Sequence, residues 1–291
     1  MSDRAARERG LGLLLGLPAL VAMLSMVGYP LFEAVRLSLY NYRITDPGAR
    51  SFVGLDNYRV VLTDALFWSD MTTTLLLTVS TVVVELVLGF AFAMVMHRIV
   101  IGRGLVRTAL LVPYGIVTVV SSFAWRYAFA LDSGFVNGWL GLADFSWFGR
   151  RESSLLVIAV SEIWKTTPFV SLLLLAGLVQ VPEDLYDAAK VDGASAWQRF
   201  VKVTLPCTRN ALLVAILFRT LDAFRIFDNV FVMTSGAHGT ESVSFLAYRQ
   251  MIGRTALGLG SAVAVVTFLA ALLLAGSLLL VGKPDLDQAE R

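Results

Sequence analysis

The chain has 291 residues, of which 57% are hydrophobic and 16% are charged, and its formal net charge is +2. Soluble domains usually carry about 25% charged residues, so this composition argues against a water-soluble protein and favours a membrane protein. The single cysteine, Cys207, excludes an internal disulfide and a cysteine-based metal or iron–sulfur site.

Apolar runs long enough to cross a bilayer recur along the chain. A helix needs about 20 apolar residues to span the hydrocarbon core, so we expect an all-α integral membrane protein with six transmembrane helices, at about 10–32, 72–96, 105–130, 154–180, 209–233 and 258–281. Short connections predict a single transmembrane domain over residues 1–291. The first run is too long for the apolar core of a signal peptide, so it is expected to remain as an anchor. Pro18, Pro113 and Pro168 are expected to kink three of the spans.

The distribution of basic residues predicts the orientation, because short cytoplasmic loops are enriched in Lys and Arg. Three clusters and one further lysine fall on the same side of a six-span topology: Arg4, Arg7 and Arg9; Arg98, Arg103 and Arg107; Lys190, Arg199, Lys202 and Arg209; and Lys283. Arginines in the opposite loops weaken this bias without reversing it. We therefore expect a multi-pass cell-membrane protein with both termini in the cytoplasm.

Two outer loops are expected on the other side. The first, Glu33–Asp70, contains Asp46-Pro47-Gly48, which predicts a turn, and the stretch FVGLDNY, which is too polar to span. The second, Asp132–Glu152, is rich in Gly, Trp and Phe. Its aromatic rings suit either an interfacial belt or a docking surface for a partner outside the membrane.

Eight ionisable residues fall inside the predicted spans: Glu85, Arg126, Glu162, Lys165, Arg219, Asp222, Arg225 and Asp228. Arg126, Glu162 and Asp228 lie near span ends and are expected to reach water. A deeper charge costs about 3 kcal/mol at a helix centre, so the others should face the bundle or a wet cavity.

The fifth span reads FRTLDAFRIFDNVF from Phe218, with charges of alternating sign at every third residue. Steps of three spiral around a helix that has 3.6 residues per turn, so the four charges cannot all line one pore. They can pair within the helix, contact other helices or face a pathway. Lys165 and Asp222 reach similar depths from opposite faces, which makes a contact between them plausible.

A polar segment, 182–206, separates the fourth and fifth spans and reads PEDLYDAAKVDGASAWQRFVKVTLP. Pro182 suits the first turn of a helix, and the acidic residues after it suit the positive end of the helix dipole. Gly193 is a natural helix stop, and Ser195 can cap a second short helix. Without a partner, such a segment would rest on the bilayer as an amphipathic helix.

The same segment resembles the EAA loop of ABC importer permeases. The matching residues are Asp187-Ala188-Ala189, Gly193 and Leu205-Pro206, with Asp where the family usually has Glu. Three stretches are similar to the MalF-like carbohydrate branch of the family: DGASAWQRFVKVTLP around this motif, FVGLDNY in the first outer loop and FRTLDAFRIFDNVFVMTSG in the fifth span. On overall likeness the chain resembles the first permeases of actinobacterial trehalose importers, and maltose-type importers look similar. Its 20 arginines against 4 lysines fit a high-GC genome, as expected for an actinobacterial protein.

The resemblance implies a permease subunit of an ATP-driven importer for a sugar, such as trehalose or a maltose-like disaccharide. It implies a heterodimer with a second homologous permease, two ABC ATPase subunits and an extracytoplasmic sugar-binding protein or lipoprotein. The 182–206 segment would be the coupling helix that docks on the ATPase, through Glu183, Asp187, Ala188, Ala189, Gly193, Leu205 and Pro206.

The sequence has no GxxxxGK[ST] phosphate loop, so ATP and Mg²⁺ are expected on the partner ATPase, with no cofactor or metal on this chain and no enzymatic activity of its own. Two alternatives remain. One is a secondary transporter driven by an ion gradient; the other is an intramembrane enzyme, for which the chain offers only two histidines, His97 and His238.

A sugar site is expected to combine aromatic platforms with hydrogen-bonding groups near the bilayer midplane. Asp222, Arg225 and Asn229 would share one face of a continuous helix, so they are preferred to Arg219 and Asp228. Helix–helix hydrogen bonding is the alternative role for Thr166, and packing is the alternative for Phe224. The full candidate set is Trp164, Lys165, Thr166, Asp222, Phe224, Arg225 and Asn229, with Tyr114 and Trp125 as further members.

Overall fold

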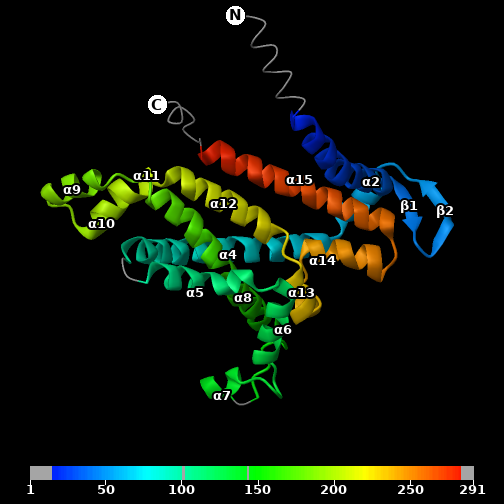
Figure 1. Cartoon of the computed structure of the whole chain (residues 1–291). Helices are drawn as coiled ribbons and strands as arrows, with labels where there is room; N and C mark the ends of the chain where they lie inside the picture. The colour runs from blue at the N-terminus through cyan, green and yellow to red at the C-terminus, as the bar shows by residue number, and fades with distance from the viewer. Residues whose placement is uncertain (1–14, 100–101, 143, 283–291) are drawn as a thin grey trace, which may run out of the picture. The chain divides into compact units, whose positions relative to one another are not determined.

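The computed structural model describes residues 15–99, 102–142 and 144–282, and these residues are mostly helical (Figure 1). Within these described ranges, four helices are long and apolar enough to cross a membrane by themselves: Leu15–Ser38, Ala65–Arg98, Arg151–Leu178 and Leu257–Gly282. Two bent helix pairs bring the number of candidate spans to as many as six. The arginines before residue 15 and Lys283, used above for the orientation, lie outside the described residues.

The chain divides into two compact units, one formed by Met1–Asp64 with Leu246–Phe268 and the other by Ala65–Phe245 with Leu269–Arg291. The described part of the first unit contains the Leu15–Ser38 span and a β-hairpin with a short helix. Its elements are η1 (Leu24–Gly28), α2 (Tyr29–Ser38), β1 (Tyr40–Arg43), β2 (Asp46–Phe52), α3 (Asp56–Thr63), η4 (Arg249–Gly253) and the start of α15 (Leu257–Gly282). The helix continues to Ser38, beyond the predicted end at 32, while the predicted start at 10 lies outside the described residues.

The hairpin corrects the all-α prediction. Strands β1 and β2 pair antiparallel, with Tyr40 opposite Phe52. The turn falls at Ile44–Thr45, and the Asp-Pro-Gly sequence that predicted a turn begins β2 instead. The Arg50 guanidinium lies 4.1 Å from the centre of the Tyr40 ring, a cation–π contact that links the two strands.

The FVGLDNY stretch has a structural role in this unit. The Asn57 side chain donates to the carbonyl oxygens of Ser38, at 2.7 Å, and Tyr40, at 3.0 Å, where the first span ends and β1 begins. A Cβ at Gly258 would collide with the Tyr40 carbonyl oxygen, so only glycine permits the close approach of α15 to β1. The stretch therefore fixes the exit of the first span.

The second unit is a helical bundle built on α4 (Ala65–Arg98) and α8 (Arg151–Leu178), which pack along each other. Its other helices are α5 (Arg103–Gly115), α6 (Thr118–Ala128), α7 (Val136–Leu140), α9 (Glu183–Val191), α10 (Ala196–Arg199), η2 (Phe200–Thr204), α11 (Leu205–Cys207), α12 (Arg209–Phe224), α13 (Asp228–Met233), η3 (Ala237–Gly239) and part of α14 (Val243–Tyr248). A Cβ at Gly89 of α4 would lie 2.7 Å from Val170 Cγ1 of α8, so this glycine sets the distance between the two helices.

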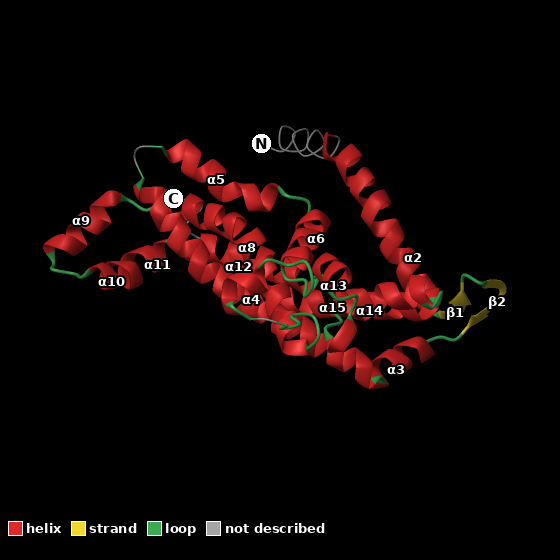
Figure 2. Ribbon diagram, turned by 90° about the horizontal axis from the view of Figure 1, so that it is seen from below, coloured by secondary structure: helices red, strands yellow, loops and turns green. Residues whose placement is uncertain are grey.

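Two of the predicted spans are broken. Helices α5 and α6 meet at 87° around Ile116–Val117, close to Pro113, where the sequence predicted only a kink. The predicted span 209–233 is interrupted between α12, which ends at Phe224, and α13, which begins at Asp228, and a 72° bend at its start separates it from Ala196–Cys207. Helix α8, in contrast, continues through Pro168. Figures 1 and 2 both show α9 and α10 projecting beyond the ends of α8 and α12.

Candidate functional site

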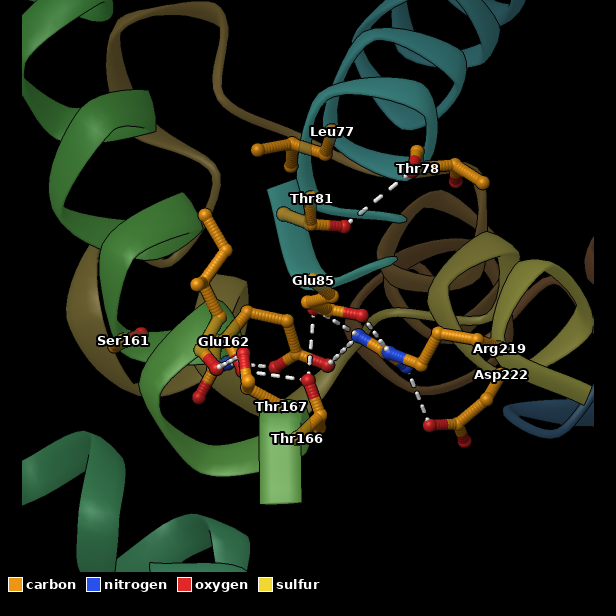
Figure 3. Close-up of polar contacts among 12 residues, drawn as sticks. Leu77, Thr78, Thr81, Glu85, Ser161, Glu162, Thr166, Thr167, Arg219 and Asp222 are labelled. Carbon is orange, nitrogen blue, oxygen red and sulfur yellow. Dashed lines mark hydrogen bonds and ion pairs between the residues drawn. The ribbon is translucent and has the colours of Figure 1, made fainter. Parts of the chain in front are cut away.

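A buried ion cluster occupies the centre of the second unit (Figure 3). The Arg219 side chain from α12 is 1% exposed and faces three carboxylates. It donates from Nε and Nη2 to Glu85 of α4, from Nη2 to Glu162 of α8 at 2.8 Å, and from Nη1 to Asp222 at 2.6 Å. Thr166 Oγ1 donates to the same Glu85 at 2.7 Å. One arginine therefore joins three helices through charge-assisted hydrogen bonds.

The cluster extends to α6, which follows the bend after α5, and to α13, which follows α12. Asn229 of α13 donates from Nδ2 to Glu162 Oε2 at 2.5 Å, and its Oδ1 accepts a hydrogen bond from Ser122 of α6. Arg126 of α6 donates to the Val232 carbonyl oxygen of α13 at 2.8 Å. Helices α6 and α13 are thus bonded to each other and, through Glu162, to the centre of the bundle.

The buried cluster corrects three expectations about the charged residues. Glu162 is 7% exposed and bonded to Arg219, so it does not reach water. Arg219, which ranked below its neighbours, is the central residue of the cluster. Among the described residues, no ion pair joins Lys165 to Asp222, which pairs with Arg219 instead. The Arg219–Asp222 pair was one of the intrahelical pairs that the spacing allowed.

The expected common face of Asp222, Arg225 and Asn229 is also wrong. Helix α12 ends at Phe224, and α13 begins only at Asp228 after an irregular turn. Asp222 and Arg225 are exposed, whereas Asn229 is 3% exposed and points into the buried cluster. Three residues of a continuous helix would have shared a face, but the interruption turns Asn229 away from the other two.

The remaining candidates separate into buried and accessible groups. Phe224 is 1% exposed and Thr166 is 6% exposed, so packing and helix–helix hydrogen bonding, the alternative roles, describe them better than contact with a solute. Trp164 and Tyr114 are 41% and 44% exposed. Half-exposed aromatic rings inside candidate spans are available to a ligand.

The accessible residues lie around the bend between α5 and α6. The rings of Trp164 and Trp125 meet edge to face at 5.9 Å between centroids. Lys165 Nζ lies 5.7 Å from the centre of the Tyr114 ring, which stacks on Phe169. We call Tyr114, Trp125, Trp164, Lys165 and Phe169 the aromatic surface. It combines flat apolar rings with an ammonium donor.

The polar segment 182–206 folds as two short helices. Helix α9 begins after Pro182, and Gly193 follows it with φ +74°, as expected for a helix stop. Ser195 caps α10 in a reciprocal capping box with Gln198. The Tyr186 hydroxyl and Thr204 Oγ1, 3.0 Å apart, join α9 to the end of η2. The predicted local structure is confirmed.

Anchoring and exposure of this segment differ along its length. Phe200 packs edge to face on Phe90 of α4, and Leu205 packs against the same core cluster. Val191 and Trp197 are 89% and 71% exposed. The segment is thus fixed to the bundle at its second half and presents apolar side chains outward at the tip. Its other predicted coupling residues, Glu183, Asp187, Ala188, Gly193 and Pro206, are exposed, while Ala189 is half-buried.

Comparisons with known proteins agree with this architecture. A family model described as "Binding-protein-dependent transport system inner membrane component" matches residues 67–282. The chain is 49% identical over 261 residues to the trehalose transport system permease protein SugA of Mycobacterium tuberculosis, covering 90% of this chain and 85% of that protein. It is 38% identical over 269 residues to the trehalose/maltose transport system permease protein MalF of Thermococcus litoralis, covering 90% of each.

One solved structure has the same fold over nearly its whole length. It is a bacterial ABC transporter involved in the import of the acidic polysaccharide alginate. The superposition gives a TM-score of 0.81 at 19% sequence identity and covers 97% of this chain and 98% of that chain. At this identity, the likeness concerns the fold.

Proposed function

We infer that this chain transports trehalose or a closely related disaccharide, because it belongs to the family of binding-protein-dependent transport system inner membrane components and is a MalF-like sugar permease subunit of an ABC importer. The single observation that carries the choice of sugar is the 49% identity to a trehalose permease over 90% of the chain. The relative at 38% identity transports trehalose or maltose by its name, so an α-linked diglucoside is the shared substrate class.

The proposed assembly contains this chain, a second homologous permease, two ABC ATPases and an extracytoplasmic binding protein. One solved relative in fold is an importer in complex with a periplasmic protein that carries an alginate pentasaccharide, which supports a binding-protein partner. ATP and Mg²⁺ would bind the ATPases, and this chain would supply the pathway without a catalytic site.

Six spans with both termini in the cytoplasm are the proposed topology, with each bent pair counted as one span. The length of α8 supports it. Its 28 residues extend about 42 Å at about 1.5 Å per residue, more than the roughly 30 Å hydrocarbon core. The loop that carries α7 precedes α8 and the 182–206 segment follows it, so the two would lie on opposite faces of the membrane.

The 182–206 segment is proposed to be the coupling helix. Its exposed tip, with Val191 and Trp197, offers apolar area to a groove on the ATPase, and the Ala188–Ala189 pair allows close approach. Phe200 and Leu205 hold its second half on the bundle, so a push on the tip would reach α12 directly through the bend at Thr208.

The aromatic surface is proposed to face the sugar. Flat rings can stack on the apolar faces of a sugar, while Lys165 donates to hydroxyl groups. The exposed carboxylate of Asp222 and the guanidinium of Arg225 are kept as further proposed contacts, because both are accessible. Thr166, Phe224 and Asn229 are reassigned to the interior on the basis of their burial.

Transport by the reconstituted complex tests the function. With both permeases, the ATPases and the binding protein in proteoliposomes, we expect ATP-dependent uptake of radiolabelled trehalose that unlabelled maltose inhibits. Uptake that follows an ion gradient and ignores ATP would instead support a secondary carrier. Uptake of neither sugar with a loaded binding protein would refute the proposed substrate class.

Site-specific cross-linking tests the coupling surface. In a Cys207→Ser background, Ala188→Cys with a short bifunctional reagent should capture the ATPase. Trp139→Cys in α7, which is 79% exposed, is the matched control and should not capture it. Capture from Trp139 and never from Ala188 would place the segment on the wrong face of the membrane.

A further inference from the structure

Glu162 joins the two sides of an interrupted span. One of its carboxylate oxygens, Oε1, accepts from Arg219 of α12, and the other, Oε2, accepts from Asn229 of α13. Between these helices the backbone of Arg225–Phe227 forms an irregular turn. At the interruption the backbone forms turn-type hydrogen bonds, from the Arg225 N–H to the Asp222 carbonyl oxygen and from the Ile226 N–H to the Ala223 carbonyl oxygen, and the side-chain bridge adds a connection between the two helices.

The environment of the bridge makes it rigid. Arg219 and Glu162 are 1% and 7% exposed, and Asn229 is 3% exposed. A buried charge that loses its partner is strongly unfavourable, because no water replaces the hydrogen bond. Any movement that separates α12 from α13 must break one of the two buried hydrogen bonds of Glu162, to Arg219 or to Asn229, so these bonds hold the two helices in one relative position.

The bridge continues into the second broken span. The Asn229 amide oxygen accepts from Ser122 of α6, and Arg126 of α6 donates to the carbonyl oxygen of Val232 in α13. Helix α6 carries Trp125 of the aromatic surface. A displacement of α12 would therefore be passed through Glu162 to α13 and then to the helix beside the proposed sugar contacts.

We propose that Glu162 of α8 is a positioning residue that makes α8, α12, α13 and α6 move as one body, and that it thereby links the 182–206 segment to the aromatic surface. The proposal rests on the function proposed above for its role in transport. The mechanical part, a fixed relation between α12 and α13, is a property of this chain alone and can be measured without any partner.

An exchange of the two bridging groups provides the test. Glu162→Gln leaves the bridge one negative charge short, and Asn229→Asp places a second carboxylate against Glu162. The double variant restores an amide–carboxylate pair with the chemistry reversed and the net charge unchanged. Neither substitution alters the shape of its side chain appreciably, since Gln and Glu, like Asn and Asp, are nearly isosteric.

Spin labels report the relation between the helices directly. In a Cys207→Ser background of the full chain in detergent, labels at Phe218→Cys on α12 and Phe231→Cys on α13 occupy exposed positions. We expect a narrow distance distribution in the parent chain, a broad or shifted one in either single variant, and a narrow one again in the double variant. A distribution that is unchanged in both single variants would overturn the proposal, as would a failure of the double variant to recover.

The second readout is coupling in the assembled complex. Loss of one charge-assisted hydrogen bond changes the equilibrium constant that it supports by about tenfold or more. We therefore expect the ATPase stimulation given by trehalose-loaded binding protein to fall about tenfold in each single variant. Basal ATP hydrolysis and assembly should be kept, and the double variant should recover most of the stimulation. Equal loss of basal and stimulated hydrolysis in all three variants would indicate a purely structural role and overturn the proposal.

Ser122→Ala is a milder variant that keeps the proposal testable if the single charge variants fail to fold. It removes only the outermost hydrogen bond of the bridge and leaves every charge paired. We expect the distance between α12 and α13 to stay narrow, because Glu162 still bonds both helices, and the stimulation to fall partly, because α6 loses one hydrogen bond to α13. A broadened distance, or an unchanged stimulation, would contradict the proposal. A wild-type complex without any sugar-stimulated hydrolysis would refute the proposed function, while the spin-label result would still decide the mechanical proposal.

Discussion

Replacement of Arg219 by leucine is expected to destabilise the second unit strongly. The arginine side chain is 1% exposed, and it is hydrogen-bonded to two carboxylates that are themselves buried, Glu85 at 0% and Glu162 at 7% exposure. Removing one partner of a buried ion pair costs about 3–5 kcal/mol, because the other partner keeps its charge without water or a counter-ion. The exposed third partner, Asp222, adds little to this cost.

The midpoint of thermal unfolding of the purified chain in detergent measures the effect. A loss of 1 kcal/mol lowers the midpoint by about 2–4 °C for chains of roughly this size, so Arg219→Leu should lower it by about 10 °C. Lys190→Met is the matched control, since Lys190 and Asp187 form an ion pair in which the side chains are 57% and 69% exposed. Such exposed pairs contribute about 0–1 kcal/mol, so this variant should shift the midpoint by at most about 4 °C.

A second-site experiment identifies the origin of the loss. In the Arg219→Leu background, Glu85→Gln with Glu162→Gln removes the two orphaned charges. If unpaired carboxylates cause the destabilisation, the triple variant should regain a large part of the lost midpoint. The reasoning would be refuted if Arg219→Leu shifted the midpoint no more than Lys190→Met, or if the triple variant were less stable than the single one.

Three further predictions concern other parts of the chain. Gly193→Ala should reduce ATPase coupling while Gly193→Asn keeps it, because the left-handed conformation at φ +74° costs an ordinary residue about 1–2 kcal/mol and asparagine tolerates it. Equal coupling in both variants would exclude a backbone cause. Gly89→Ala should destabilise the chain by about 1–3 kcal/mol in thermal unfolding through its clash with Val170, and Val170→Ala should restore it; an additive loss would argue against that clash. Trp164→Ala should raise the sugar concentration for half-maximal transport about tenfold or less without changing thermal stability, as expected for one aromatic contact of about 0.5–1.5 kcal/mol; unchanged transport would remove it from the proposed site.

Local structure in the polar segment could be predicted from the sequence because its determinants are neighbours along the chain. A proline before two acidic residues, a glycine at a left-handed position and a serine three residues before Gln198 each act within one helical turn. The same holds for the family resemblance, which rests on short motifs with fixed spacing, and the family is confirmed. The hairpin was missed because Asp46-Pro47-Gly48 predicts a turn by its composition, whereas the turn lies at Ile44–Thr45 and Asp46 already begins β2.

Charged residues inside the spans were harder to assign from sequence. Spacings of three and four residues on an uninterrupted helix placed Asp222, Arg225 and Asn229 on one face, but the helix ends before Asn229. The hydropathy prediction placed Glu162 near water because a position in a span is judged by its distance from the span end. Such a prediction cannot detect that Arg219 of another helix pairs with it. One signal could have pointed to Arg219. Glu85 and Glu162 lie within two different spans, and buried carboxylates need a cation from a neighbouring helix as their partner.

Composition and short motifs are enough to predict that this chain crosses a membrane several times, belongs to a sugar-importing permease family and carries two short helices between its fourth and fifth apolar runs. Those properties depend on composition and on contacts within a few residues. Which charge is buried, which aromatic rings stay accessible and where the spans break could be read only from the folded chain. Such outcomes depend on which side chains from distant helices meet, because a buried charge is tolerated only where its partners converge.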